Sequence, residues 1–389
     1  MINDVLFTFL SKLFLILQPL FSHKGFICVD NMYEKHASCI DTYTIFEYLV
    51  KEGKYARYLF WKKNLSYDKL KKKKGVIFFN RQGSPRQSSL YFLIKTFFIL
   101  LKCRYFISSF YGSLPIKYRQ FIKNNRYISL VGVGHGPVML KTLVFNYPFC
   151  QDKEWDLYLV SSVNEKRLFI DNGWNEKKLI ECSLPRFDCC KNVSHSVKKI
   201  FIMFTWRLTF EKRPKPIYSS KYLLNLMRLL NNQTLKDCCK KNKIEIILGV
   251  HHAITDICGV NINFPCKLAD SNNLIDEINA SDLFITDYSS IFWDSAYLNH
   301  PVIFYRLDED DRFLCDTDIS DIKNSKRNDN KLYNVFYNED DVVNKIIYYI
   351  EHNFKLEKKY ENKMNKFFYT RKDCTQSFLK KLEEKENEC

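Results

Sequence analysis

A histidine between two glycines follows a predicted strand, and its side chain could act in catalysis there. Gly134-His135-Gly136 follows directly on the apolar run Arg126–Val133, which predicts a buried β-strand. Two glycines let a backbone approach a ligand closely, and an imidazole exchanges protons near neutral pH. A histidine at a strand end is also common as a structural residue, so these residues alone leave both roles open.

A second histidine cluster follows another predicted strand. His251 and His252 come directly after the apolar run Ile244–Val250 in the second half of the chain. Their type suits proton transfer or the stabilisation of negative charge. One histidine cluster in each half, both at strand ends, is the arrangement that an active site between two domains would need.

The third cluster combines hydroxyl groups with a predicted helix N-terminus. A short apolar strand ends at Thr286, and a helix is expected over Ile291–Leu298. The hydroxyls of Thr286, Ser289 and Ser290, with free backbone N–H groups, predict an anion site suited to a pyrophosphate. Simple N-capping by one of the serines is the alternative, and the two roles are compatible. Asp287 would either orient this loop or contact the ligand.

Strand-like and helix-like segments alternate through both halves of the chain. Strands are expected at Phe26–Val29, Tyr58–Trp61, Val76–Phe79, Tyr105–Ile107, Arg126–Val133, Leu157–Ser161, Lys199–Phe204, Ile244–Val250, Leu283–Thr286 and Val302–Tyr305. Helices are expected at Thr44–Lys51, Asn164–Asn172 and Tyr222–Lys241. This alternation predicts two α/β domains with parallel sheets, and such sheets bind ligands at the carboxyl ends of their strands.

The length of 389 residues exceeds one ordinary core and suits two domains. Hydrophobic residues make up 46% of the chain, which is ample for two packed interiors. We expect an apolar N-terminal segment over residues 1–24, one α/β domain over 25–192 and a second α/β domain over 193–350. Residues 351–389 form a tail whose alternating charges predict an exposed helix.

The apolar segment Val5–Phe21 is a poor candidate for a membrane span. It contains Lys12 and Gln18, and about 17 residues is the short limit for crossing a bilayer. It also lacks the basic start and the small-residue cleavage site of a signal peptide. A helix lying in the membrane interface and an ordinary buried first helix both fit.

The formal net charge of +16 predicts anionic partners, such as nucleotide donors, polyphosphates or acidic lipid headgroups. The absence of zinc-finger spacing and of an aromatic RNA-binding motif argues against nucleic acid. The fourteen cysteines show no paired C-x-x-C motifs, so we expect reduced thiols and no structural zinc. No dense carboxylate cluster demands a divalent ion. We therefore expect no required cofactor, although Mg²⁺ could accompany a bound pyrophosphate.

Several motifs together resemble those of the CDP-glycerol glycerophosphotransferases, which include teichoic acid primases, teichoic acid polymerases and capsule relatives. The segments that carry the resemblance are SDLFITDYSSIFWDSAYLNHPVIFY at 281–305, GHGPVMLKT at 134–142, LPRFD at 184–188, FTWR at 204–207, His251, and the tail RKDCTQSFLKKL at 371–382. They occur in the family's order and span roughly residues 25 to 385, nearly the whole chain.

The resemblance implies a glycosyltransferase-B-like fold, with two Rossmann-like domains facing each other across a cleft. It also implies that the domain over 25–192 lies on the acceptor side and that the domain over 193–350 binds the CDP-activated donor. His135 would be the general base that deprotonates an acceptor hydroxyl, and His251 with Arg207 would stabilise charge on the donor pyrophosphate. Ser289 and Ser290 would hold phosphate oxygens. The reaction would transfer a polyol phosphate from a CDP-activated donor to a cell-surface polymer or its lipid-linked acceptor and release CMP.

The sequence departs from the family pattern in ways that add candidates. Lys141 is displaced by one position, and the residues usually found before the second histidine are replaced, so His252 could take the role of His251. Gly134, Gly136 and Arg186 match motif positions and are further binding candidates. The donor could therefore carry glycerol, ribitol or another group.

Two alternatives remain open at this point. A nucleotide-sugar glycosyltransferase of the same fold would read sugar hydroxyls with carboxylates such as Asp282, Asp287 and Asp294. A non-catalytic protein that binds polymer or lipid is the other alternative. In the main interpretation we expect the chain on the cytoplasmic side of the cell membrane, attached peripherally to its anionic surface.

Overall fold

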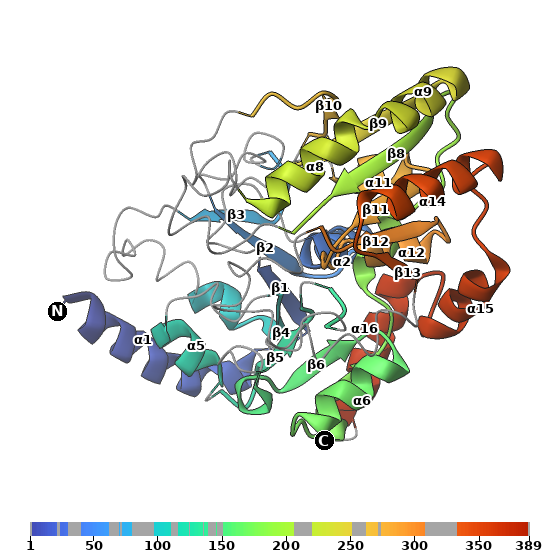
Figure 1. The fold of residues 1–389 in the computed structure, drawn as a ribbon. Coiled ribbons are helices and arrows are strands. Elements are labelled where there is room, and N and C mark those ends of the chain that lie inside the picture. The colour runs from blue at the N-terminus through green and yellow to red at the C-terminus, as the bar shows by residue number, and fades with distance from the viewer. Residues whose placement is uncertain are drawn as a thin grey trace. The chain divides into compact units, whose positions relative to one another are not determined.

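The chain folds into two compact units, each built on one sheet (Figure 1). The computed structural model describes residues 2–21, 24–29, 40–61, 70, 72–79, 97–109, 116–123, 125–134, 136–138, 145, 151–205, 220–250, 262–270, 274–307 and 333–387. The first unit comprises Met1–His135, Phe145–Asp188 and Tyr369–Cys389, and the second comprises Gly136–Val144 and Cys189–Phe368.

The first unit contains a seven-stranded parallel sheet in the order β3-β2-β1-β4-β5-β6-β7. Its strands are β1 (Gly25–Val29), β2 (Ala56–Trp61), β3 (Val76–Phe79), β4 (Cys103–Ser108), β5 (Ser129–Gly132), β6 (Leu157–Val160) and β7 (Leu179–Glu181). Its helices are α1 (Ile2–Leu17), α2 (Ile40–Lys51), α5 (Ile116–Lys123), α6 (Val163–Asp171) and α16 (Cys374–Asn387), with short 3₁₀ turns η1 (Gln18–Leu20), η5 (Asp152–Glu154), η6 (Glu176–Lys178) and η7 (Pro185–Cys189).

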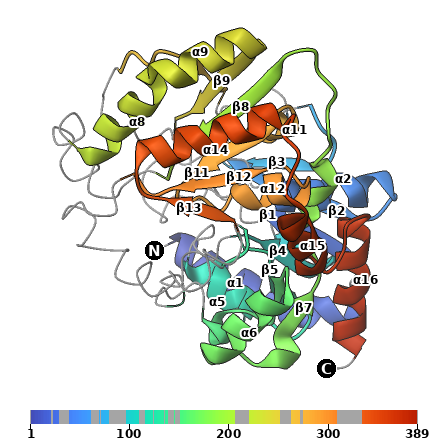
Figure 2. The ribbon, with the colours of Figure 1, turned by 45° about the vertical axis from the view of Figure 1, so that its right-hand side comes forward.

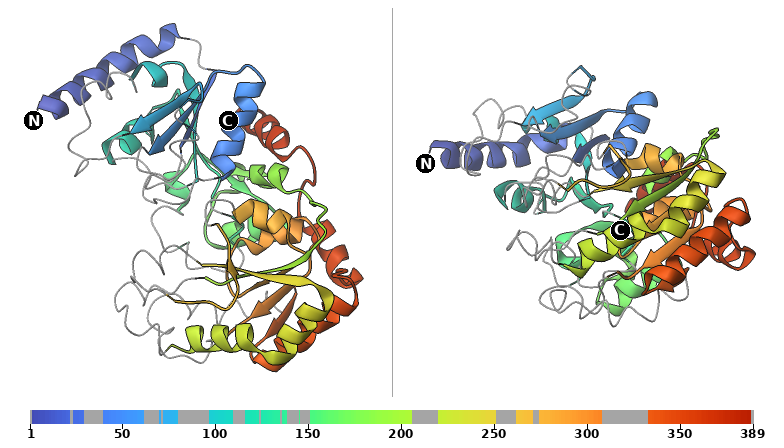
Figure 3. Two further views of the ribbon diagram at one scale, coloured as in Figure 1. Left: turned by 90° about the horizontal axis from the view of Figure 1, so that it is seen from above. Right: turned by 45° about the horizontal axis from the view of Figure 1, so that its top comes forward.

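Helices cover both faces of this first sheet. Phe46 of α2 stacks on Tyr58 of β2, and α16 lies beside α2. Phe169 of α6 packs on Tyr158 of β6. Because side chains alternate along a strand, the register of the sheet puts Tyr58 and Tyr158 on opposite faces. Figure 3 shows α1, in dark blue, and α16, in red, on opposite sides of the sheet. The strands are buried on both faces, as expected of a parallel sheet.

The second unit contains a six-stranded parallel sheet in the order β10-β9-β8-β11-β12-β13. Its strands are β8 (Lys198–Met203), β9 (Ile244–Gly249), β10 (Lys267–Leu268), β11 (Leu283–Thr286), β12 (Val302–Tyr305) and β13 (Asn334–Phe336). Its helices are α8 (Lys221–Asn231), α9 (Gln233–Asn242), α11 (Leu274–Asn279), α12 (Phe292–Tyr297), α14 (Glu339–Glu351) and α15 (Lys358–Phe367).

The core of the second unit lies on both sides of its sheet. Helices α8, α9 and α14 lie over one face of the sheet (Figure 2). Their apolar residues pack with side chains of that face, among them Ile202 and Ile285. On the other face Phe292 of α12 packs against Phe304, and Trp293 stacks on Phe367 of α15 at 4.3 Å between ring centroids. All six residues of α12 are buried, so this helix is fixed from both sides.

The α/β class with two parallel sheets is confirmed, and the details differ in three places. The helix expected over Tyr222–Lys241 is two helices, because Asn232 adopts an extended backbone and begins α9. The strand expected over Arg126–Val133 is only β5, and the short strands β7, β10 and β13 were not predicted. The tail is not an exposed helix, since Phe378 and Leu382 of α16 are fully buried. The cleft between domains stays a prediction.

The N-terminal helix combines a packed face with an exposed apolar face. Phe14 is buried and makes edge-to-face contacts with Phe97 and Phe121. Ile16 and Leu20, in contrast, are 70% and 77% exposed. Among the described helices, none has the length and apolar character needed to cross a bilayer. The packed face fits the interpretation as a first helix of the unit, and contact of the exposed face with a membrane stays a prediction.

Candidate active site

Three strands of the second sheet end at one edge, each just before or within a predicted motif. β8, β9 and β11 run parallel and end at Met203, Gly249 and Thr286. Met203 is paired with Gly249 across β8 and β9, and β11 lies on the other side of β8. These strand ends therefore lie at the carboxyl edge of the sheet, where open α/β sheets bind ligands.

Asp287 connects two of the loops at this edge. Its side chain is fully buried, and its Oδ1 accepts a hydrogen bond from the backbone N–H of Thr205, at 2.8 Å, and one from that of Tyr288, at 2.6 Å. Thr205 immediately precedes the Trp206-Arg207 pair of the FTWR motif. These contacts fit the role of orienting the loops, and contact of Asp287 with a ligand stays a prediction.

The three hydroxyl residues after β11 fall into two groups. Thr286 is buried, and its Oγ1 donates to the carbonyl of Met203 at 2.6 Å, so this hydroxyl joins two strands. Ser289 and Ser290 are half-buried, and their hydroxyls bond to no residue in the described part of the chain. The N-cap of α12 is Ile291, without a side-chain cap bond. N-capping by a serine, the alternative for this motif, is therefore not observed.

Sequence reasoning missed Arg306, a buried cation at the same edge. Arg306 is 3% exposed and directly follows β12, and its backbone N–H donates to the carbonyl of Phe336. Its guanidinium lies 3.6 Å from the ring centroid of Tyr288, a cation–π contact. A charged residue directly after the apolar run Val302–Tyr305 was the available signal.

In the first unit, the strand β5 leads into the glycine-histidine motif. Gly134 has φ +63° and Gly136 has φ +140°, values that residues with a Cβ rarely adopt. Both glycines are thus required by the backbone path, as the motif indicated. His135 between them lies outside the described residues.

Arg186, a binding candidate from the LPRFD motif, is engaged inside the first unit. It is 8% exposed, and Asp41 at the start of α2 is 1% exposed. The Asp41 carboxylate accepts from the Arg186 backbone N–H at 2.9 Å and lies 3.4 Å from its guanidinium Nη1. Removing one partner would leave a buried charge, so this pair has a structural role in its described contacts.

The same motif binds the C-terminal helix. Asp188 accepts hydrogen bonds from the backbone N–H groups of Cys374 and Thr375, both at 2.8 Å, at the start of α16. These groups belong to the helix end whose N–H groups lack partners within the helix. Two separate motif segments, LPRFD and the tail, are thus brought together.

The remaining predicted residues lie outside the described part of the chain. They are His135, Lys141, Arg207, His251 and His252, and their roles stay predictions. Across the described ranges, no cluster of three or more His, Cys, Asp or Glu side chains could hold a metal ion.

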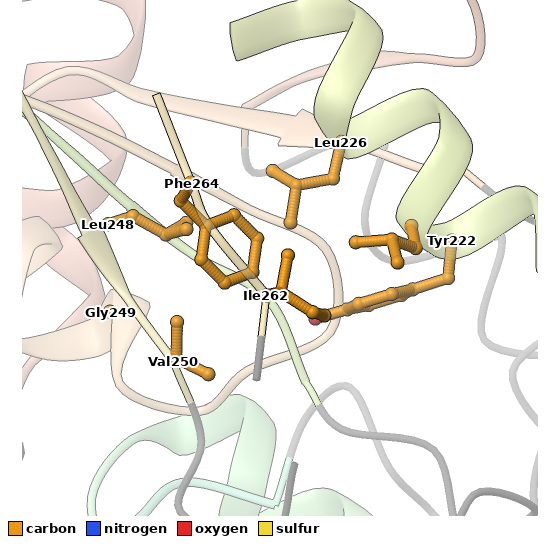
Figure 4. Close-up of a pocket in the computed structure, with 8 residues that line it drawn as sticks. Tyr222, Leu226, Leu248, Gly249, Val250, Ile262 and Phe264 are labelled. Atoms are coloured by element: carbon orange, nitrogen blue, oxygen red, sulfur yellow. The ribbon is translucent and has the colours of Figure 1, made fainter. Parts of the chain in front are cut away.

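A small apolar cavity lies at the end of β9, just before His251 in the sequence (Figure 4). Tyr222 and Leu226 of α8 close it on one side, and Gly249, Ile262 and Phe264 on the other. Its volume is about 10 Å³, room for at most one water. A cavity of this size is too small for a ligand, and the residues around it pack against the end of β9.

Residues 31–377 match the family described as CDP-Glycerol:Poly(glycerophosphate) glycerophosphotransferase. The chain belongs to this family. The match covers all the motif segments at 134–142, 184–188, 204–207 and 281–305, and the resemblance is confirmed.

Relatives of known name include two proteins of teichoic acid synthesis. The minor teichoic acid biosynthesis protein GgaB of Bacillus subtilis is 30% identical over 237 residues, which are 57% of this chain and 25% of that protein. A teichoic acid poly(glycerol phosphate) polymerase of Bacillus spizizenii is 29% identical over 175 residues, 39% of this chain and 41% of that protein. The aligned regions thus span a quarter to two-fifths of these relatives.

Solved structures share the fold of this glycerophosphotransferase family member. The wall teichoic acid polymerase TagF superimposes with a TM-score of 0.63 at 15% identity, covering 99% of this chain and 96% of that chain. A UDP-GlcNAc 2-epimerase from Neisseria meningitidis reaches 0.55 at 11% identity, covering 94% and 100%. At these identities the likeness establishes the fold alone.

Proposed function

We propose that this chain transfers a polyol phosphate, glycerol phosphate or ribitol phosphate, from a CDP-activated donor to an acceptor hydroxyl. The observation that carries the proposal is the family match over residues 31–377. The acceptor is a cell-surface polymer or its lipid-linked precursor. A solved TagF structure obtained after a soak with CDPG supports a CDP-linked donor.

The proposed step is a displacement at the β-phosphorus, the one that carries the polyol. The acceptor oxygen forms a new P–O bond as the pyrophosphate bond breaks, and CMP leaves with the bonding electron pair. His135 takes the proton of the acceptor hydroxyl. His251 and Arg207 offset the negative charge that develops on the leaving group.

Three residues at the carboxyl edge of the second sheet suit supporting roles in this proposal. Asp287 holds the backbone of Thr205 and thereby the start of the segment that carries Arg207. The hydroxyls of Ser289 and Ser290, which bond to no described residue, can donate to phosphate oxygens. Donor binding by these serines remains part of the proposal.

The nucleotide-sugar alternative draws no support from the carboxylates it would use. Asp282 lies at the amino end of β11 and is bound by His195 at 2.8 Å and Lys198 at 2.7 Å. Asp287 accepts backbone bonds, and Asp294 is buried within α12. These three side chains are used by the fold rather than held toward a sugar.

The proposal includes peripheral attachment to the cytoplasmic face of an anionic membrane, because a lipid-linked acceptor is reached there. The charge of +16 and the exposed apolar face of α1 support it. Nucleic acid is not proposed as a partner. No cofactor is proposed, and activity should survive EDTA unless Mg²⁺ assists the leaving group.

The test is nucleotide release from CDP-glycerol, CDP-ribitol and UDP-sugars with membranes as acceptor source. CMP release from one CDP-polyol, abolished in His135→Ala, is expected. Ser289→Ala and Ser290→Ala should each raise the donor KM about tenfold or more, while Ser295→Ala, within the buried helix α12, should not. UDP release would favour the glycosyltransferase, and binding of donor without turnover would favour the non-catalytic alternative.

A further inference from the structure

An open pocket of about 880 Å³ lies in the first unit at the amino edge of its sheet. This is the edge opposite to the one that carries the Gly134 motif, because β1 and β4 begin here and β5 ends there. The starts of β1 and β4, the turn between α2 and β2, and the end of α16 line it. Its volume is within the range of ligand pockets in proteins.

Cations dominate the lining of this pocket. Lys24, Lys54, Lys102 and Arg104 line it, against two carboxylates from α16, Glu383 and Glu386. Glu386 is paired with Arg104 and accepts from the hydroxyl of Tyr105. The three lysines are exposed, and none forms an ion pair with a described residue. The pocket therefore carries positive charge that the described protein does not neutralise.

The lysines project from a fixed floor. The backbone N–H of Gly25 donates to the carbonyl of Lys102 at 2.9 Å, and that of Phe26 to the carbonyl of Tyr55, next to Lys54, at 2.9 Å. These bonds tie together the three segments that carry the lysines. With such a floor, binding of an anion has to order the lysine side chains but not the backbone that carries them.

The exposed apolar face of α1 and η1 adjoins the pocket. Phe21, directly after η1, lines it. Ile16 and Leu20 are 70% and 77% exposed and lie four residues apart, on one face of this segment. Phe14, on the other face, is packed into the unit. Side chains such as Ile16 and Leu20 fit the boundary between headgroups and acyl chains.

We infer that this pocket binds the phosphate-bearing headgroup of an anionic phospholipid while the exposed face of α1 and η1 contacts the acyl chains. Charge complementarity and the adjoining apolar face favour a lipid over a free phosphate polymer, which offers nothing apolar to this face. The inference rests on the proposed membrane attachment and gives it a location. The inferred lipid binding does not depend on catalytic turnover.

The test is flotation of the purified chain with vesicles of phosphatidylcholine alone or mixed equally with phosphatidylglycerol. Lys54→Ala/Lys102→Ala should weaken binding to the mixed vesicles about 25-fold, since each lysine near an anionic surface contributes about fivefold. Lys240→Ala/Lys241→Ala, an equal charge change on exposed lysines of α9, is the control and should weaken it far less. Ile16→Gln/Leu20→Gln should weaken binding to vesicles more than Leu224→Gln/Leu268→Gln.

Each other outcome contradicts the inference in a distinct way. Equal vesicle binding by both lysine variants would contradict lipid binding in the pocket and would leave the proposed membrane attachment unaffected. No vesicle binding by the native chain would contradict both the lipid pocket and the membrane attachment. Lysine-dependent binding of poly(glycerol phosphate) in place of vesicles would make the pocket a polymer site. If Ile16→Gln/Leu20→Gln changed the molar mass of the protein in light scattering and left vesicle binding intact, the apolar face would be a contact between copies of the chain.

Discussion

Two carboxylates at opposite ends of β11 show how position decides the role of a residue. Asp282, at the amino end, is bound by His195, Lys198 and the backbone of Lys199. Burial acts to raise the pKa of Asp282, but these hydrogen bonds outweigh it and hold the pKa below its usual value. Asp287, at the carboxyl end, accepts from backbone groups of the loops that border the candidate site.

Asp287→Asn should lower turnover while the fold persists. An uncharged amide is a weaker acceptor for the N–H groups of Thr205 and Tyr288, so the two loops would shift, and displacements of about 1 Å can cost about 100-fold in rate. CMP release measures the effect. Asp282→Asn is the matched control, since it should lower the urea midpoint with kcat unchanged. An equal loss of kcat in both variants would show that Asp287 acts through stability only.

His300 should make the stability of the fold depend on pH. Its Nε2 lies 2.6 Å from Oδ1 of Asn192. Burial lowers the pKa of His300 from 6.5 to about 4. The charge of Asp282 acts to raise this pKa, and the charges of His195 and Lys198 act to lower it. Between these values the unfolded chain binds the proton and the folded chain does not. Stability therefore falls as the pH drops from about 6.5 to 4, by about 3 kcal/mol in all.

Urea unfolding at pH 7, 6 and 5 tests this expectation with His300→Gln, which retains a donor for Asn192. The variant should lose less stability than the native chain over this range. Parallel curves for the two proteins would show that His300 is not the group responsible.

At the scale of elements, the junction between α8 and α9 depends on Asn232. Its Oδ1 accepts from the backbone N–H of Leu235 at 3.0 Å, and its Nδ2 donates to Glu339 at the start of α14 at 2.7 Å. Asn232→Ala should destabilise the chain by about 1–2 kcal/mol in urea unfolding. Asn231→Ala, one residue earlier on the exposed surface, should cost less than about 0.5 kcal/mol. Equal costs would contradict the capping role.

The strands and this junction show which elements can be predicted from a sequence. β3, β11 and β12 are continuous apolar runs between polar residues, and their expected bounds were right. β10 and β13 are short edge strands without an apolar run, so no pattern marked them. Leucines continue on both sides of Asn232, at Leu230 and Leu235, and the break between α8 and α9 is fixed by the cap bond of Asn232 and by its contact with Glu339.

The candidate site divides in the same way. Residues at or just after the end of a strand, such as Thr286 and Ser289, could be located because parallel strands end at one edge. The Asp41–Arg186 pair joins residues 145 positions apart, and the contact of Arg306 with Tyr288 depends on neighbouring strands. Such pairings arise from the assembled fold, and a single sequence carries no local sign of them.

At the scale of the whole molecule, the chain leaves the first unit after Asp188 and returns to it at Tyr369. The return is secured by hydrogen bonds from Thr370 to Ser183 and from the start of α16 to Asp188. Cys374, Phe378 and Leu382 of α16 are completely buried. The last residues of the chain are thus part of the core formed by its first half.

Deletion of residues 369–389 should therefore unfold the first unit and spare the second. Burial of a large apolar side chain contributes about 1.5–3 kcal/mol, so Phe378 and Leu382 alone account for about 3–6 kcal/mol, comparable to the total stability of many domains. Limited proteolysis followed by mass spectrometry should show cleavage within the first unit and a resistant fragment from residues 189–368. Asp188→Ala, which removes only the bonds to Cys374 and Thr375, should cost about 1–2 kcal/mol and leave both units resistant. A truncated chain with native resistance in its first unit would show that α16 contributes little to that core.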